Sequence, residues 1–349
     1  MRRGLISRSK AELPDAVLDA RIERVRAAMR EAHLDAMLVY TNNTRAAGVS
    51  WLTGFVPYWS DALLVVPRDR PPVLVVALTY RVKSWIERVS RVAEVVHTPR
   101  IGLEAARMIA AWKADAAVGV ADLDGLSTGI VEDLRAGGAR LTLRDATALF
   151  ARLRAEADPA EIALAMKAAA IAQRALAQAS GRSLAEIIAV VEAQARALGA
   201  EEVYVAAAPD LKRDRRLKRI EGDASLGKSF ALRATVAYKG SWVRVVRTLG
   251  SATGGEGAAA MFAAAVAELP SGRGFAAFSS WLVEGCRIAQ PLEPLMGSRM
   301  TDPSPPPPKA LVSVQASLQI NGRSVLLGAP ALLGQRGEAA SLLVHPLQP

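Results

Sequence analysis

Two arginines, Arg233 and Arg244, lie eleven residues apart in the segment FALRATVAYKGSWVRVVRTLG, residues 230–250. Apolar and polar residues alternate on both sides of Lys239-Gly240, which predicts a two-stranded hairpin that directs both guanidiniums at a shared centre. Such a pair can hold a carboxylate or a phosphate bidentately. The other hypothesis is an internal ion-pair network with Glu284 or Glu293, because an unpaired buried charge is very costly.

Three further residues could take part in catalysis. Cys286, the single cysteine of the chain, is a candidate nucleophile, and Glu284 and Glu293 are candidate general acids or bases. A lone cysteine with no histidine nearby is more often an inert core residue. The chain has only three histidines, and none lies close to the hairpin in sequence: His33, His97 and His345.

Length and composition predict two domains and the cellular compartment. The chain has 349 residues, of which 51% are hydrophobic, enough for a large core. No apolar run is long enough to span a bilayer, and the N-terminal segment lacks the apolar region of a signal peptide. With one cysteine, no internal disulfide can form. We therefore expect a cytoplasmic protein with no membrane partner.

The net charge of +10 raises the question of a nucleic-acid partner. The densest basic cluster is LKRDRRLKR, residues 211–219, in which Asp214 interrupts the run and no aromatic residue is interleaved. Nucleic-acid patches usually combine a continuous basic surface with stacking groups. A solvated loop is therefore favoured, and nucleic-acid binding is the least favoured function.

The elements needed to position these residues fall into two halves. Up to residue 154, helical and strand patterns alternate, which predicts an α/β domain with a mixed sheet. Helices are expected over 15–32, 80–88 and 103–113, with another between residues 122 and 140, and strands over 34–40, 61–67, 72–78, 92–98, 116–122 and 140–146.

The second half, 155–349, begins with two helices that have clear start signals. Asp158, Pro159 and Glu161 form a capping-box pattern, and Ser183 with Glu186 forms a second, whose helix should end at Gly199. Strands dominate after residue 201, with one more helix over 257–268. The proline-rich stretch 301–309 predicts an exposed spacer.

Three stretches resemble the creatinase/Xaa-Pro aminopeptidase family. They are WLTGF (51–55), LRAEADPAEIALAMKAAAIAQRAL (153–176) and AYKGSWVRVVRTLG (237–250), the last containing the pair Arg247-Thr248. The resemblance implies a creatinase-like α/β N-terminal domain and an α+β pita-bread C-terminal domain.

Members of that family have a metal site with two aspartates, one histidine and two glutamates, and the resemblance implies where these positions fall in this chain. Here the two aspartate positions carry Arg233 and Arg244, each of which exchanges an anionic ligand for a permanent cation. The histidine position falls most nearly on Cys286, and the glutamates near Gln315 and Gly328. The resemblance thus predicts no metal and no other cofactor. The histidine base of creatinase is also missing, with Asp210 the nearest ionisable residue.

These observations leave several functions open. The first is a metal-free, non-peptidase relative that binds a small anion, a peptide or a partner in the former cleft. The alternative is a metal-independent hydrolase or lyase acting on a small carboxylate or amide. Candidate ligand-binding residues are Arg233, Arg244, Arg247, Trp242, Tyr58 and Trp59.

We expect a homodimer, because relatives with this layout commonly dimerise and the aromatic stretch around Trp51, Tyr58 and Trp59 would suit an interface. Packing inside the N-terminal domain is the alternative explanation for these aromatics. Light scattering at micromolar concentration measures the molar mass in solution, and a single species of 37.0 kDa would contradict the expected homodimer.

Overall fold

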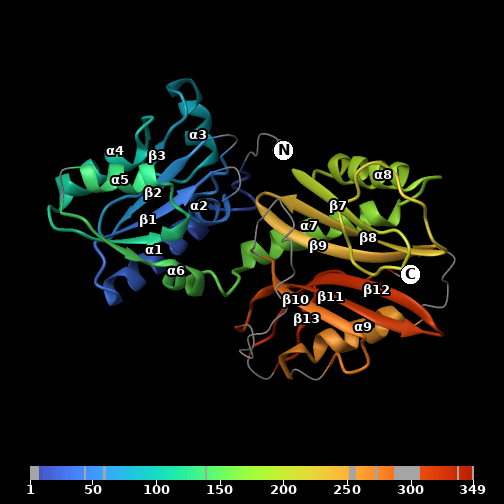
Figure 1. Ribbon diagram of the computed structural model, residues 1–349. Coiled ribbons are helices and arrows are strands. Elements are labelled where there is room, and N and C mark those ends of the chain that lie inside the picture. Colours follow the sequence, from blue (N-terminus) through green and yellow to red (C-terminus); the bar gives the residue numbers. More distant parts are fainter. Residues whose placement is uncertain are drawn as a thin grey trace. The chain divides into compact units, whose positions relative to one another are not determined.

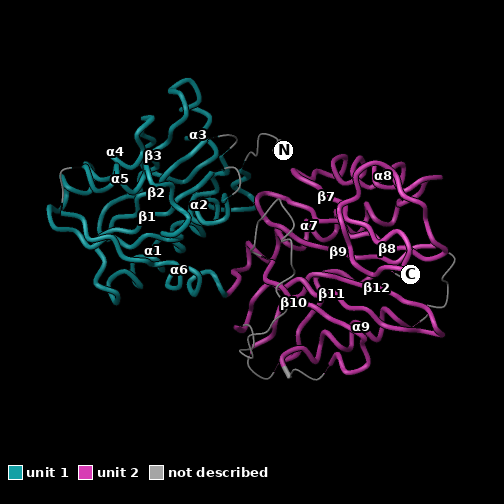
Figure 2. The backbone as a smooth tube through the Cα atoms, in the orientation of Figure 1, with its two compact units in different colours: residues 1–155 teal, residues 156–349 magenta. Residues whose placement is uncertain are grey.

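A computed structural model describes residues 8–42, 45–57, 60–137, 140–250, 257–271, 274–286, 307–335 and 338–347. The chain divides into two compact units, Met1–Ala155 and Glu156–Pro349 (Figure 2). No helix among the described residues is long and apolar enough to cross a membrane.

The first unit is built on a six-stranded mixed sheet with the order β4-β3-β2-β1-β5-β6. The pairs β1–β2 and β2–β3 are antiparallel, whereas β3–β4, β1–β5 and β5–β6 are parallel. The strands are β1 (Ala36–Thr41), β2 (Ala62–Pro67), β3 (Val73–Val76), β4 (Glu94–His97), β5 (Ala117–Ala121) and β6 (Thr142–Asp145).

Helices cover both faces of this sheet (Figure 1). One layer packs on Met37, Val39 and Leu64, and it consists of α1 (Asp15–Glu31), α2 (Ala47–Thr53), α3 (Lys83–Val89) and α6 (Thr147–Leu153). The other packs on Leu38 and Val118, and it consists of α4 (Ile101–Trp112) and α5 (Thr128–Ala136). Two short 3-10 helices, Tyr80–Val82 and Leu123–Gly125, complete the unit.

The second unit is built on an antiparallel sheet with the order β10-β11-β12-β9-β8-β7, and β13 pairs with β12. The strands are β7 (Glu202–Ala208), β8 (Ser229–Tyr238), β9 (Ser241–Gly250), β10 (Ser280–Gly285), β11 (Leu311–Ile320), β12 (Arg323–Leu332) and β13 (Ser341–Leu342).

The long helices of this unit pack on the same face of the sheet. α7 (Pro159–Ala177) and α8 (Leu184–Ala197) bury Leu232 and Val245 of the first strands, while α9 (Ala258–Ala267) buries Val314 and Leu327 of the others. The 3-10 helix Leu269–Ser271 follows α9. Because side chains alternate between faces along a strand, the neighbours of these apolar residues point to the opposite face, which we call the helix-free face.

Local sequence signals predicted many of these elements. Lys239 and Gly240 both have positive φ angles, of 48° and 77°, as a two-residue hairpin turn requires, and this is the turn between β8 and β9. The capping box at Asp158 and Glu161 is complete.

Three details differ from the sequence-based expectations. The carboxylate of Glu186 accepts from the backbone N–H of Arg182 and not from that of Ser183, so the second capping box is only half formed. The short helices α2 and α6 were not expected, because seven residues show too little periodicity to reveal a helix.

Candidate functional site

The helix-free face of the second sheet carries polar side chains that are nevertheless largely buried. Leu211 and Leu217, from the loop after β7, pack on Ala231, Val246 and Leu326 and shield one end of this face. The register of the strands places the following polar or aromatic residues on it: Glu202, Tyr204, Arg233, Thr235, Trp242, Arg244, Thr248, Glu284, Ser313, Gln315 and Ser317.

Arg233 on β8 reaches across the sheet to β11. Four residues on neighbouring strands form a row across the sheet. In order they are Arg233 on β8, Val246 on β9, Gly328 on β12 and Gln315 on β11. The Nη1 atom of Arg233 donates to Gln315 Oε1 over 3.4 Å. The absence of a side chain at Gly328 fits this crossing, since a Cβ there would lie 2.7 Å from Val246 Cγ2.

Arg244 forms a buried ion pair with Glu284. Its Nη1 atom lies 3.1 Å from Glu284 Oε2, and the two side chains are only 9% and 8% exposed. Arg244 lies on β9 and Glu284 on β10, three strands away, so the pair links the two halves of the sheet. The prediction that an internal acid would neutralise the arginine pair therefore holds for Arg244.

Two buried threonines on this face differ sharply in their hydrogen bonding. Thr248 Oγ1 donates to Leu326 O and accepts from Leu326 N, both over 2.8 Å. Thr235 Oγ1 is buried and has no hydrogen-bond partner among the described residues. Thr235 lies directly opposite Arg244 and two residues from Arg233. These three residues are thus neighbours on the helix-free face, and we call them the donor triangle.

An aromatic wall flanks the donor triangle. The Tyr204 and Trp242 rings stack with their centroids 5.8 Å apart and their planes at 12°. The Tyr204 hydroxyl donates to Glu202 Oε2, and Glu202 is itself buried. Sequence reasoning missed Glu202, Tyr204 and Thr235. The two-residue spacing of Glu202 and Tyr204 on β7, and that of Thr235 and Arg233 on β8, could have indicated them.

Other predicted site residues lie elsewhere. Arg247 sits opposite Leu232, on the helix-covered face, where its Nη1 atom donates to Leu176 O at the end of α7 over 3.0 Å. Burial lowers the pKa of Arg247. Cys286 is buried in the hydrophobic cluster that includes Leu311. Three predicted residues lie outside the described part of the chain: Tyr58, Trp59 and Glu293.

The residues at this centre do not fit a divalent metal ion. Metal ions such as Mn²⁺ need anionic oxygens or imidazole nitrogens, and a guanidinium has no lone pair to offer. Arg233 and Arg244 would repel a cation, and Glu284 is engaged by Arg244. Within the described residues no group of three or more His, Cys, Asp or Glu side chains could hold a metal.

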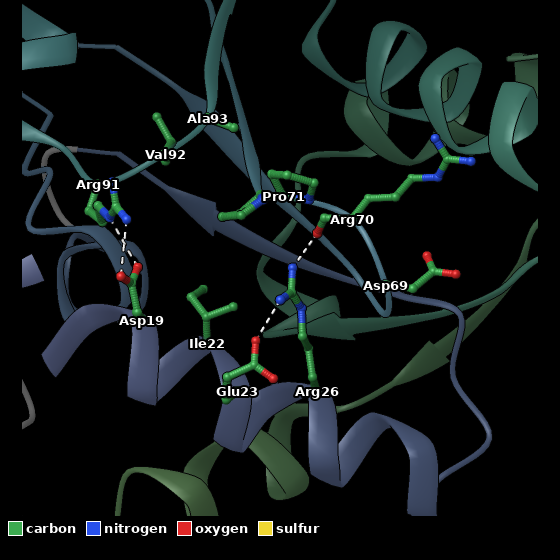
Figure 3. A pocket seen from close by; sticks show the side chains of 11 residues that line it. Asp19, Ile22, Glu23, Arg26, Asp69, Arg70, Pro71, Arg91, Val92 and Ala93 are labelled. Carbon is green, nitrogen blue, oxygen red and sulfur yellow. Dashed lines mark hydrogen bonds and ion pairs between the residues drawn. The ribbon is translucent and has the colours of Figure 1, made fainter. Parts of the chain in front are cut away.

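A cavity of about 450 Å³ lies in the first unit, between α1, the β2–β3 turn and the segment before β4 (Figure 3). Four of its six charged side chains already pair with one another. Arg91 pairs with both oxygens of Asp19 over 3.0 Å, and Arg26 pairs with Glu23 and donates to Arg70 O. A ligand would have to break these contacts, so we prefer the helix-free face as the functional site.

Comparisons with known proteins agree with the overall fold. The model of the creatinase/prolidase N-terminal domain matches residues 21–155. The whole chain is similar to an Xaa-Pro dipeptidase from Bacillus anthracis, with a TM-score of 0.71, 17% identity, and coverage of 95% of this chain and 99% of that chain. It is also similar to an X-Pro aminopeptidase from Thermotoga maritima, with a TM-score of 0.70, 15% identity, and coverage of 93% and 97%.

A third similar structure is the N-terminal domain of the FACT complex subunit SPT16 from Cicer arietinum. Its TM-score is 0.64 at 13% identity, with coverage of 94% of this chain and 96% of that chain. No curated protein matches the sequence. At these identities the likeness concerns the fold, and it confirms the predicted fold class of a creatinase-like N-terminal domain followed by a pita-bread domain.

The donor set predicts that the purified protein binds no stoichiometric Mn, Co, Zn or Fe, because two guanidiniums occupy the centre of the site. Elemental analysis after dialysis against each metal measures this. One equivalent or more, bound within residues 156–349, would contradict the prediction.

The buried ion pair predicts a large effect of Glu284→Gln on stability. The substitution leaves Arg244 buried without its counter-charge, which should cost about 3–5 kcal/mol, whereas Arg244→Met combined with Glu284→Leu should cost far less. Urea unfolding followed by circular dichroism measures both. Glu221→Gln, at an exposed acid of the same unit, serves as the control and should change little. Equal stability of Glu284→Gln and wild type would show that the pair contributes nothing.

Proposed function

We propose that this chain, which belongs to the creatinase/prolidase family through its N-terminal domain, is a metal-free relative that binds a small anion on the helix-free face of its pita-bread domain. The observation that carries the proposal is the donor triangle of Arg233, Thr235 and Arg244. The triangle occupies the centre of the sheet, and by the resemblance to the creatinase/Xaa-Pro aminopeptidase family its two arginines stand where that family has aspartates.

The surroundings of the triangle favour ligand binding over a purely structural role. The Arg244–Glu284 pair fixes one guanidinium in place, so little side-chain entropy is lost when a ligand binds. Thr235 Oγ1 is a buried hydroxyl with no hydrogen-bond partner among the described residues. Such groups are rare because each one destabilises the folded state. A carboxylate or phosphate oxygen beside Arg244 would satisfy it.

The aromatic wall narrows the class of ligand. Tyr204 on β7 lies directly opposite Thr235 on β8, and Trp242 lies two residues from Arg244 along β9, so the stacked rings share a face with the triangle. An apolar ligand body could pack against such rings while its acid group reaches the triangle. We therefore favour a small carboxylate metabolite, and a phosphorylated compound is the alternative outcome of the experiment.

Peptide hydrolysis is not favoured by the same residues. The dipeptidase and the aminopeptidase share the fold with this chain, but a fold hosts several functions, and one of the similar structures is named as a subunit of a complex. A metal-independent hydrolase or lyase would need an available nucleophile or base. Glu284 is engaged by Arg244 and Cys286 lies in a hydrophobic cluster.

Nucleic-acid binding through the cluster 211–219 also finds little support. Asp214 binds both Arg216 and Lys218, which lowers the pKa of its carboxyl group. Leu211 and Leu217 point into the sheet and not toward a partner.

The ligand hypothesis predicts different outcomes for two threonine variants. Thermal-shift assays at constant ionic strength would compare small carboxylates, phosphorylated metabolites and orthophosphate. A ligand at a hundred times its Kd stabilises by about 2.7 kcal/mol, which raises Tm by several degrees. Thr235→Val should keep the Tm of the free protein and lose this gain, because only an unpartnered hydroxyl is removed.

Thr248→Val is the matched control, since it removes two hydrogen bonds from the same face. It should lower the Tm of the free protein and keep the ligand-induced gain. If Thr235→Val and Arg244→Lys both retain the gain, or if no carboxylate or phosphate produces one, the proposed site is wrong.

A further inference from the structure

Three arginines surround one buried tryptophan in the first unit. The guanidinium carbons of Arg21, Arg24 and Arg154 lie 5.4, 5.1 and 5.9 Å from the centroid of the Trp51 ring. Arg21 and Arg24 come from α1, Trp51 from α2, and Arg154 directly follows α6. This cluster therefore joins three helices of the same layer.

Cation–π attraction explains part of this arrangement. A guanidinium near an indole face gains a modest electrostatic attraction. Arg21 also donates from Nη1 to Trp51 O over 2.7 Å and is only 3% exposed. The attraction of each guanidinium for the ring does not remove the repulsion among three cations gathered around it.

Two hydrogen-bond donors in this cluster have no acceptor. Arg24 Nη2 and Trp51 Nε1 are both buried and without a hydrogen-bond partner among the described residues. Trp51 is only 5% exposed, so water has little access to its indole N–H. A buried donor with no acceptor is uncommon and often marks an ion or water that completes the site.

The first unit supplies no carboxylate for Arg24. Arg24 forms no ion pair within the residues that the structure covers. The remaining stretches of this unit, 1–7, 43–44, 58–59 and 138–139, contain no Asp or Glu in their sequence. Neither the described residues nor these four stretches therefore supply an acid that pairs with Arg24.

We propose that the N-terminal unit has an oxyanion site between Arg24 and Trp51. One oxygen accepts from Arg24 Nη2 and the same or a second oxygen accepts from Trp51 Nε1, while the three guanidiniums supply the positive field. The chemistry fits phosphate or a carboxylate, because both offer several strong acceptor oxygens. The site lies wholly within the first unit and does not depend on the donor triangle.

The indole N–H of Trp51 gives a direct readout in the full-length protein. Selective ¹⁵N-tryptophan labelling yields one indole cross-peak for each of six tryptophans, and the peak absent from Trp51→Phe identifies Trp51. Sodium phosphate, sodium succinate and sodium chloride are titrated separately at constant ionic strength. We expect a saturable shift of the Trp51 peak with phosphate or succinate and none with chloride, and the anion that saturates identifies the class.

Arg24→Gln should weaken the binding of that anion roughly tenfold or more, because a charge-assisted hydrogen bond is lost. Arg30→Gln, at an exposed arginine of the same helix, should leave the affinity unchanged. Arg24→Lys keeps the positive charge but loses the two-pronged guanidinium, so its affinity for the anion should lie between those of Arg24→Gln and Arg30→Gln. Thr235→Val should leave the Trp51 shift intact, which separates this site from the donor triangle.

Unperturbed positions of the other five indole peaks show that a variant is folded. No saturable shift with either phosphate or succinate would overturn the proposal. Equal affinity in Arg24→Gln and wild type would also overturn it.

Discussion

A guanidinium donates hydrogen bonds and accepts none, and burying it without an acceptor costs much free energy. The helix-free face of the second sheet is organised by this constraint. Arg244 is buried there, so its charge must be met, and the acid that meets it is Glu284, three strands away. Arg233 crosses the same number of strands to Gln315, over the position where Gly328 has no side chain. Both arginines thus lie along the sheet and tie its halves together.

Much of the fold was predictable because its signals are local. Asp158, Pro159 and Glu161 determine where α7 begins, and Lys239-Gly240 determines the turn between β8 and β9. The helices α2 and α6 were not predictable in this way, since each has seven residues and owes its helical state to packing on the first sheet. Glu186 is a second case that local sequence did not predict, because its carboxylate accepts a hydrogen bond from the N–H of Arg182 and not from that of Ser183.

The candidate site was predictable where it depends on residue type and not where it depends on register. Arg233, Arg244 and Glu284 stand out as charged residues in strand patterns. Arg247 also stands out, yet it is three residues from Arg244 and must therefore point to the other face. Thr235 carries no signal of its own. Its importance appears only when the register places it opposite Arg244 and leaves its hydroxyl without a partner.

The sheet separates the residues that stabilise the domain from those that determine its chemistry. Residues such as Leu232, Val245 and Leu327 point toward α7, α8 and α9 and form the hydrophobic core. Their neighbours along the same strands point to the helix-free face, where the side chains are polar. A substitution that reverses charge on that face leaves the helix-packed core intact, provided that a partner such as Glu284 satisfies the new charge. The fold can therefore hold a positively charged centre, and the chemistry of the chain depends on that centre and not on the fold alone.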